Sequence, residues 1–456
     1  MDQELRARGT GTTRQSGGAI LGTEIVAART LSRIRWLLLP FLGLLYIVSY
    51  LDRVNVSFAK LTMNTAIGID DATYAFGAGI FFVGYFLFEV PSNLILERVG
   101  ARRWIARIMI TWGLVSAATA LVTGPRSFVA MRFLLGVAEA GFFPGILLYL
   151  TYWFPSSERA RVVGLFMVAI PLSGLIGSPL SAELMRLNGL GLQGWQWMLI
   201  LEGLPAVLLG VACLAFLPDG PKDATWLEDD EREWLTATLA TERRTLAKDG
   251  HTTLRAALVQ PRVWALALAY FGIVLALYGS NFWLPSLISA HGVELRYTGW
   301  IAALPFLCGA PFMVWWGRRS DRRDERLLHL IAVAVLGFAG FAAASLFDSL
   351  PLQILCLCLA LMGVYGSFPV FWTLPTAFLT GTAAAAGIAL INSLGNLAGY
   401  FGPQVVAWLT HGSNDYGPAL FALGLSMLTP AIVVLVLRAK PLAGARGPGT
   451  MRQSSP

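Results

Sequence analysis

Apolar stretches of about 20 residues recur along this chain from one end to the other. A helix of that length crosses the hydrocarbon core of a bilayer, where helices satisfy their own backbone hydrogen bonds. The chain has 456 residues and is 56% hydrophobic and 13% charged, whereas globular domains carry about 25% charged residues. We therefore expect an all-α membrane protein with twelve transmembrane helices. The expected spans are approximately 34–58, 74–96, 104–123, 127–151, 161–185, 195–217, 263–289, 297–316, 328–347, 351–378, 383–409 and 418–438.

The longest polar segment lies between the sixth and seventh spans and divides the chain into two halves. Within it, Trp226, Leu227, Trp234 and Leu235 alternate with the charged run Glu228–Glu233, which predicts either a short amphipathic surface helix or a solvated linker. The halves also repeat weakly, as in secondary transporters that place a site between two bundles. The expected units are a tail, a six-helix bundle, a central loop, a second six-helix bundle and a tail, at 1–33, 34–217, 218–260, 261–438 and 439–456.

The basic residues are distributed unevenly between the two sides of the membrane. With the N-terminus in the cytoplasm, 28 of the 34 lysines and arginines fall on the cytoplasmic side. This asymmetry is typical of the positive-inside rule, so we expect both termini in the cytoplasm and the chain in the cell inner (plasma) membrane. The net charge of +7 then reflects topology: it does not indicate a nucleic-acid partner, and attraction to membrane lipid is secondary. The basic residues expected outside are Lys60, Arg126, Arg186 and Arg296.

Four charged residues lie inside expected spans and indicate a path for ions or substrate. Asp52 and Arg53 are consecutive in the first span, and Arg132 and Glu139 lie seven residues apart in the fourth. An ionisable group inside a membrane is costly unless it has a partner or faces a wet cavity. A buried acid can change protonation as its partner changes, whereas arginine keeps its charge and fits a carboxylate. The alternative is a structural ion pair with no role in transport.

Other polar residues in the spans allow two interpretations. Glu89 and Glu202 have no neighbouring arginine in sequence, so we favour a structural role for both, toward the middle or the cytoplasmic half. Buried hydroxyl, amide and indole groups need partners, which are either neighbouring helices or a polar ligand. The residues of this kind that we place at the cavity are Tyr85, Asn281, Trp372, Thr373 and Asn396.

Two basic loops occupy matching places in the two halves. The loop after the second span has Glu97 followed by Arg102 and Arg103, and the loop after the eighth span has Asp321 among arginines. An acid at a helix end can bridge to arginines on a neighbouring helix end and hold the cytoplasmic side shut. The alternative, ordinary positive-inside charge, explains the arginines but not the placed acids.

Signatures of other protein classes are missing from the sequence. It has no Walker loop, no cluster with the spacing of metal ligands and no expected cofactor, so we expect neither an ATP-driven pump nor an enzyme. The four cysteines lie inside expected spans and are interpreted as small buried hydrophobes. No cleavable signal sequence precedes the first span.

The order of the motifs resembles the major facilitator superfamily and its anion:cation symporter branch. The superfamily resemblance rests on the two basic loops and the twelve-span layout. The branch resemblance rests on four motifs: Asp52-Arg53-x-Asn55, Phe88-Glu-Val-Pro-Ser-Asn93, Arg132-Phe-x-Leu-Gly-x-x-Glu139 and Glu202-Gly-Leu-Pro205. That branch includes bacterial sugar-acid, tartrate and phthalate permeases and animal vesicular glutamate carriers.

The resemblance implies proton-driven uptake of an organic anion. By this resemblance Asp52 and Glu139 couple protons, Arg53 contacts the substrate carboxylate, and Arg132 pairs with the acids. The resemblance also places Tyr50, with Tyr85, Thr373 and Asn396, where sugar-acid permeases line the cavity. The seventh span lacks the arginine of the glutamate carriers and looks most like tartrate and phthalate permeases.

We therefore expect a proton symporter that imports a small organic carboxylate such as tartrate, phthalate or a sugar acid. One alternative is an exporter of drugs or metabolites driven by proton exchange, for which Gly174–Pro179 is a partial motif match. A second alternative is a membrane sensor that does not transport.

Overall fold

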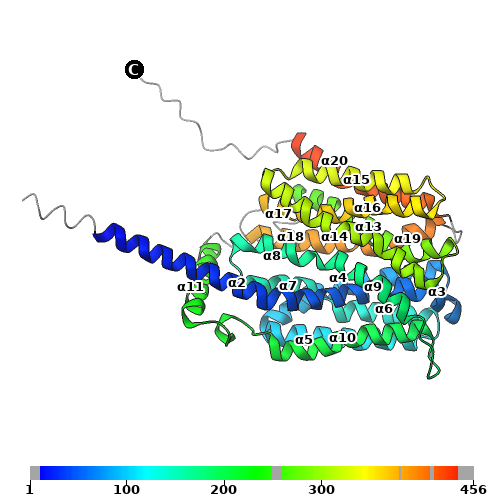
Figure 1. Cartoon of the computed structure of the whole chain (residues 1–456), viewed down its shortest axis with the longest axis horizontal. Helices are drawn as coiled ribbons and strands as arrows, with labels where there is room; N and C mark the ends of the chain where they lie inside the picture. Colours follow the sequence, from blue (N-terminus) through cyan, green and yellow to red (C-terminus); the bar gives the residue numbers. More distant parts are fainter. Residues whose placement is uncertain (1–10, 249–258, 379–381, 411–414, 440–456) are drawn as a thin grey trace, which may run out of the picture.

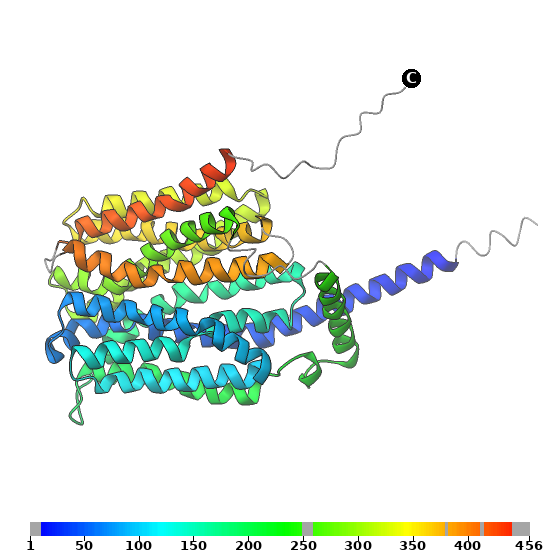
Figure 2. The ribbon, with the colours of Figure 1, turned by 180° about the vertical axis from the view of Figure 1, so that it is seen from behind.

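A computed structural model describes residues 11–248, 259–378, 382–410 and 415–439, and its named elements are all helices (Figure 1). The helices run nearly parallel or antiparallel to one another, and two bundles lie side by side (Figure 2). This arrangement confirms the all-α fold with two six-helix bundles.

The first bundle contains α2 to α10, and the central loop follows it. The elements of this half are α2 (Gly11–Val54), α3 (Val56–Ile67), α4 (Asp71–Val99), α5 (Ala101–Ala118), η1 (Thr119–Leu121), α6 (Pro125–Glu139), α7 (Phe142–Thr151), α8 (Ser156–Met167), α9 (Ala169–Leu184), α10 (Gly194–Phe216), η2 (Pro221–Asp223) and α11 (Asp229–Lys248).

The second bundle begins after the central loop. Its elements are α13 (Pro261–Ala290), α14 (Leu295–Arg323), α15 (Leu327–Ala344), α16 (Leu350–Phe371), α17 (Thr373–Phe378), α18 (Thr382–Asn396), α19 (Ala398–Thr410) and α20 (Gly417–Ala439).

Among the described residues, 11 helical segments are long and apolar enough to cross a membrane. The eleventh expected span, 383–409, is the one that is not among these segments; it is present as α18 and α19, which are separated at Leu397. Similar breaks divide the first, fourth, fifth and tenth spans. Broken helices are tolerated at membrane depth where protein surrounds them.

The break between α6 and α7 has a clear local cause. Gly141 adopts φ +84°, a left-handed conformation that favours glycine. A Cβ at this position would lie 2.3 Å from Ser92 Oγ of α4. As a result α6 ends at Glu139, and this acid lies at a helix terminus inside the bundle.

Close helix approach in the first bundle depends on glycine. A Cβ at Gly136 of α6 would lie 2.0 Å from the carbonyl oxygen of Phe81 in α4. Small residues at such positions let helix backbones pack directly against each other in membranes. This contact fixes α6, with Arg132 and Glu139, against α4.

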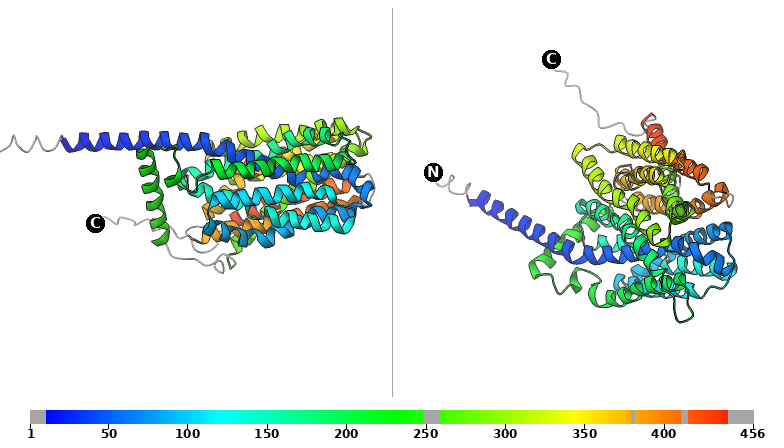
Figure 3. Two further views of the ribbon diagram at one scale, coloured as in Figure 1. Left: turned by 90° about the horizontal axis from the view of Figure 1, so that it is seen from below. Right: turned by 45° about the vertical axis from the view of Figure 1, so that its right-hand side comes forward.

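The two ends of the molecule differ. At one end α11 crosses the extended start of α2, which projects beyond the bundles (Figure 3). Arg29 and Arg33 of α2 form ion pairs with Glu231 of α11 at 3.0 and 2.7 Å, and the Glu231 side chain is fully buried. We call this the α11 end and the opposite one the α3 end. The helix predicted in the central loop is therefore present, and α2 is helical well before residue 34.

Candidate functional site

The site is centred on Arg53, near the C-terminus of α2. Its Nη2 forms an ion pair with Glu139 Oε1, and its Nη1 donates to the hydroxyl of Tyr278 in α13 at 2.9 Å. Ser49 Oγ, one turn earlier on α2, donates to the same Glu139 oxygen at 2.8 Å. The guanidinium therefore connects an acid of its own bundle to a phenol of the other bundle.

Aromatic rings enclose this guanidinium. Its carbon lies 5.7, 5.2 and 5.3 Å from the ring centroids of Tyr50, Phe81 and Tyr85. Arginine is attracted to ring faces at these distances, and the attraction increases when water is excluded. Arg53 is only 6% exposed, and its Nε has no hydrogen-bond partner. The site thus holds a buried cation whose Nε–H donor is unused.

Asp52 faces a different environment from its neighbour. Its carboxylate accepts from Trp112 Nε1 at 2.6 Å and from Ser116 Oγ, both on α5, and from Asn55 Nδ2 at 3.1 Å. Consecutive helix residues point about 100° apart, which turns Asp52 into the first bundle and Arg53 toward the second. The described residues include no ion pair of Asp52.

Arg132 does not form the ion pair with Asp52 or Glu139 that the resemblance implies; no such pair occurs within the described ranges. Its Nη2 donates to the backbone carbonyl of Arg53 at 3.5 Å, and its guanidinium carbon lies 5.3 Å from the Phe81 ring centroid. Its Nε has no partner, and the residue is 1% exposed. Arg53 takes the acid instead, because α6 ends at Glu139 and presents it to α2.

A small cavity between the bundles adjoins Arg53. It offers about 20 Å³ to the centres of water-sized molecules, roughly room for one water. In this conformation the cavity must widen before an organic ligand can enter. Half of its lining residues are aromatic, and the others are four aliphatic residues, one cation and two amides: Tyr46, Tyr50, Arg53, Tyr85, Phe143, Met167, Ile170, Tyr270, Val274, Leu277, Tyr278, Phe368, Asn392 and Asn396.

Of the residues expected at the cavity, Tyr50, Tyr85 and Asn396 line it together with Arg53, whereas Asn281, Trp372 and Thr373 do not. Asn281 is 4% exposed, and neither its Nδ2 nor its Oδ1 has a hydrogen-bond partner. Trp372 packs on Tyr270, a lining residue, with ring centroids 5.0 Å apart. Thr373 Oγ1 donates to the Val370 carbonyl at 2.7 Å.

The sequence reasoning missed Tyr46 and Tyr270 as lining residues. Tyr46, Tyr50 and Arg53 are spaced i, i+4 and i+7, a pattern that places them on one helix face. That spacing was a usable signal for Tyr46. Tyr270 shares its face of α13 with Tyr278, but the apolar residues between them hide this relationship in the sequence.

Glu89 connects the two bundles next to the cavity. It accepts from Asn392 Nδ2 at 3.0 Å and from Ser393 Oγ at 2.9 Å, both on α18 of the second bundle. Because Asn392 also lines the cavity, this contact lies at the cavity wall.

Glu202 is buried within the first bundle. Its Oε1 accepts from Ser181 Oγ at 2.7 Å, and its Oε2 has no partner. It lies three residues before the midpoint of α10, so it is close to the middle of that helix and slightly toward the α3 end.

A comparison with models of known families identifies the family of this chain. The model of the Major Facilitator Superfamily matches residues 42–403. The chain belongs to the Major Facilitator Superfamily. This membership accords with the fold and with a role in membrane transport, and the chain's motifs are those of an anion:cation symporter-type permease.

Individual relatives of this superfamily member have different names. It is 49% identical over 420 residues to a protein of Agrobacterium vitis named "Putative tartrate transporter", with 92% of this chain and 97% of that protein covered. It is also 41% identical to a "Quinolone resistance transporter" of Acinetobacter baumannii, with 88% and 93% covered.

A solved structure of the superfamily has the same fold. The partially occluded, inward-open xylose transporter XylE of E. coli matches with a TM-score of 0.69 and 16% identity, covering 89% of this chain and 98% of that one. At this identity the match supports the fold alone.

The two basic loops of this superfamily member differ in their contacts. Asp321 forms an ion pair with Arg326 of the same loop at 2.5 Å. Arg102 instead contacts Asp219 after α10, with its backbone nitrogen 2.9 Å from Asp219 Oδ1. Among the described residues, neither Glu97 nor Arg103 forms an ion pair. The bridge between neighbouring helix ends stays a prediction.

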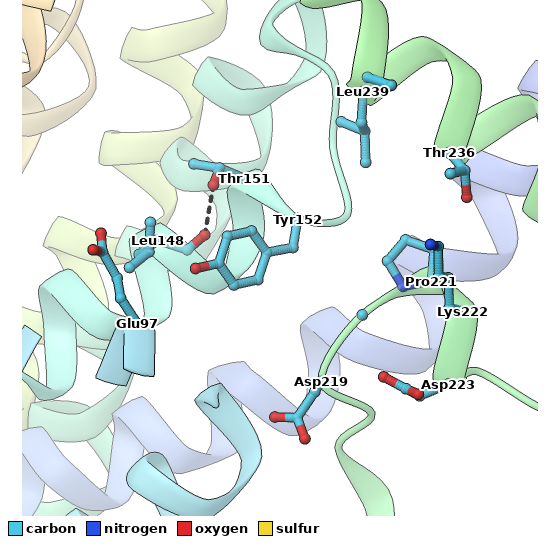
Figure 4. A pocket seen from close by; sticks show the side chains of 12 residues that line it. Glu97, Leu148, Thr151, Tyr152, Asp219, Pro221, Lys222, Asp223, Thr236 and Leu239 are labelled. Atoms are coloured by element: carbon cyan, nitrogen blue, oxygen red, sulfur yellow. Dashed lines mark hydrogen bonds between the residues drawn. The ribbon is translucent and has the colours of Figure 1, made fainter. Parts of the chain in front are cut away.

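Glu97 lines a pocket of about 970 Å³ at the α11 end. Figure 4 shows Glu97 beside Leu148 at one side of the pocket, with Asp219 and Asp223 also at the wall. This pocket lies within the first half of the chain and its central loop, apart from the cavity at Arg53.

Proposed function

We propose that this protein is a secondary transporter that imports a small organic carboxylate together with protons by alternating access. The observation that carries the proposal is the buried ion pair between Arg53 and Glu139 at the edge of the cavity. The names of the tartrate-transporter relatives support the same substrate class.

The ion pair supplies a physical link between proton and anion. While Glu139 is ionised it neutralises Arg53, and a substrate carboxylate has to compete for the same guanidinium. Protonation of Glu139 removes that competitor and leaves Arg53 as a buried cation in need of an anion. Proton binding and carboxylate binding therefore favour each other, as reciprocal linkage requires.

Asp52 serves in this proposal as a second proton site. Three neutral donors, from Trp112, Ser116 and Asn55, satisfy its carboxylate without a cation. Asp52 can therefore exchange its proton without breaking the Arg53–Glu139 pair.

The cavity lining favours a particular kind of anion. Arg53 suits one carboxylate, the amides of Asn392 and Asn396 suit hydroxyl or further carboxylate oxygens, and the tyrosine rings suit a flat or compact body. Tartrate, sugar acids and phthalate all meet these conditions. Asn281, Trp372 and Thr373 remain proposed contacts in a wider, open state.

We propose a plasma (inner) membrane location with the α11 end in the cytoplasm. The extended start of α2, α11 and the arginines that end α14 all gather there, in accord with the positive-inside rule. The α3 end then faces outside, and this conformation is closed on that side.

Uptake into proteoliposomes tests the proposal. Labelled tartrate, phthalate and a sugar acid should be tried with and without an inward proton gradient, beside liposomes that lack protein. Accumulation of at least one acid above equilibrium, and its collapse with a protonophore, is the expected result. Absence of gradient-driven accumulation for every acid would contradict the proposal.

The relative named for quinolone resistance favours one rival function, proton-driven export. Both functions use the same proton sites, but the direction of net movement differs. An exporter would expel a quinolone from vesicles when protons enter from the opposite side, and tartrate would not compete. Competition by tartrate against a labelled carboxylate, without competition by a quinolone, favours the importer.

A further inference from the structure

We infer that Lys60 is the gating residue that holds the α3 end closed, by binding across the bundle interface to Trp283 and Ser286. This inference rests on the proposed alternating access and assigns its outer closure to named side chains. The distribution of basic residues in the sequence assigns Lys60 only to the outer side of the membrane.

The structure buries Lys60 at the interface. It lies in α3 and is only 9% exposed. Its Nζ forms an ion pair with Asp71 of α4 at 2.9 Å, within the first bundle. Long basic side chains near helix ends usually extend into water, so burial of this ammonium requires compensating contacts.

The compensating contacts come from the second bundle. Lys60 Nζ lies 4.1 Å from the ring centroid of Trp283 in α13 and donates to Ser286 Oγ at 3.3 Å. Tryptophan has the aromatic ring most attractive to a cation, and exclusion of water strengthens that attraction. The ammonium therefore has partners in both bundles at once.

Neighbouring contacts also join the two bundles beside Lys60. The hydroxyl of Tyr74, on α4, donates to the Phe282 carbonyl at 3.0 Å, and its ring packs edge-on against Trp283 with centroids 5.6 Å apart. Trp283 Nε1 donates to the Pro403 carbonyl of α19 at 3.1 Å, which fixes the indole under Lys60. If the bundles separate at this end, Lys60 keeps Asp71 but loses Trp283 and Ser286.

Labelling of a buried cysteine tests this assignment without any substrate. Ala75 of α4 is 1% exposed and lines a groove at the α3 end together with Gln404 and Ala407 of α19. Ala75→Cys is made after the native cysteines Cys213, Cys308, Cys356 and Cys358 are replaced. Maleimide labelling in detergent reaches both ends of the molecule, so the result does not depend on topology.

Lys60→Met and Trp283→Leu should each raise the labelling rate at position 75 about threefold or more. The double variant Lys60→Met/Trp283→Leu should label about as fast as either single variant, because both changes remove the same interaction. Lys60→Arg should stay near the parent rate because it keeps the cation. Arg126→Ala removes an exposed cation and is the matched control, expected to be silent.

Parent-like labelling in both Lys60→Met and Trp283→Leu would overturn the assignment. Size-exclusion profiles and labelling of a cysteine at the 90% exposed Leu190 separate a changed conformation from misfolding. If Lys60→Met misfolds, Ser286→Ala gives a second test, with a smaller increase expected. Parent-like labelling would contradict the gate assignment but not the proposed carboxylate uptake. Failed uptake together with the expected labelling would contradict the proposed uptake but not the gate assignment.

Discussion

Asp52 and Arg53 are consecutive residues whose side chains belong to different parts of the molecule. Asp52 accepts hydrogen bonds from α5 inside the first bundle, whereas Arg53 reaches Glu139 and, across the interface, Tyr278. One helical step thus separates a buried carboxylate that does not line the cavity from a cation that does. The predictions below follow from this division.

Removal of the Arg53 guanidinium should abolish carboxylate uptake. Arg53→Ala leaves Glu139 without its cation and the cavity without an anion partner, so uptake should fall at least about tenfold. Arg53→Lys should recover little, because a single ammonium cannot contact Glu139 and Tyr278 as the planar fork does. Arg126→Ala is the control. Full uptake by Arg53→Ala in proteoliposomes would show that another residue binds the carboxylate.

Amide replacements of the two acids should separate exchange from accumulation. Glu139→Gln and Asp52→Asn remove proton sites, so net uptake should no longer follow the proton gradient. Substrate exchange across the membrane should survive, because exchange does not require proton release. Counterflow measured beside gradient-driven uptake tests this, and unchanged accumulation in both variants would show that other residues couple the proton.

A glycine-to-alanine pair should separate packing from chain entropy. Gly136→Ala places a Cβ 2.0 Å from the Phe81 carbonyl, so α4 and α6 must move apart, at a cost of about 1–3 kcal/mol. Gly43→Ala, with no atom within 4 Å of the added Cβ, should be neutral or stabilise α2 by about 0.4–1 kcal/mol. Apparent melting temperatures in detergent provide the measurement. Equal stability of the two variants would mean that α4 and α6 have room to adjust.

The loop acids should affect the balance between open states. Asp321→Ala should shift the protein toward the state that is open at the α11 end, and Arg326→Ala should do the same because the two residues form an ion pair. A change of about 1–3 kcal/mol is enough to move a near-balanced equilibrium. A cysteine at Asn396 in the cavity should then label faster, and one at Ala75 slower. Parent-like rates at both positions would assign the loops to topology alone.

Much of the fold follows from apolar length and charge, because these properties decide which segments cross a bilayer. Helix breaks do not follow, since they depend on contacts between segments. The φ of Gly141 and its contact with Ser92 end α6 at Glu139. Gly141 is visible in the sequence, but glycine occurs in most of the spans, so its presence alone does not predict a break at this point.

The residues of the site are predictable from the sequence, but most of the contacts between them are not. Intramembrane charge identifies Asp52, Arg53, Arg132 and Glu139, but it does not say which of them pair. Helix periodicity also places Tyr46 beside Arg53. The positive-inside rule assigns Lys60 to a side but cannot show that it is buried against Trp283, because that contact joins residues 223 positions apart.

Proton movement during carboxylate entry tests the central claim most directly. Tartrate, or whichever acid accumulates in the uptake assay, is added outside proteoliposomes in weakly buffered medium while external pH is recorded. If Arg53 is released by protonation of Glu139, the external pH should rise as the anion enters, and Arg53→Ala and Glu139→Gln should abolish the rise. Entry of the anion without any pH change in the parent protein would contradict the account.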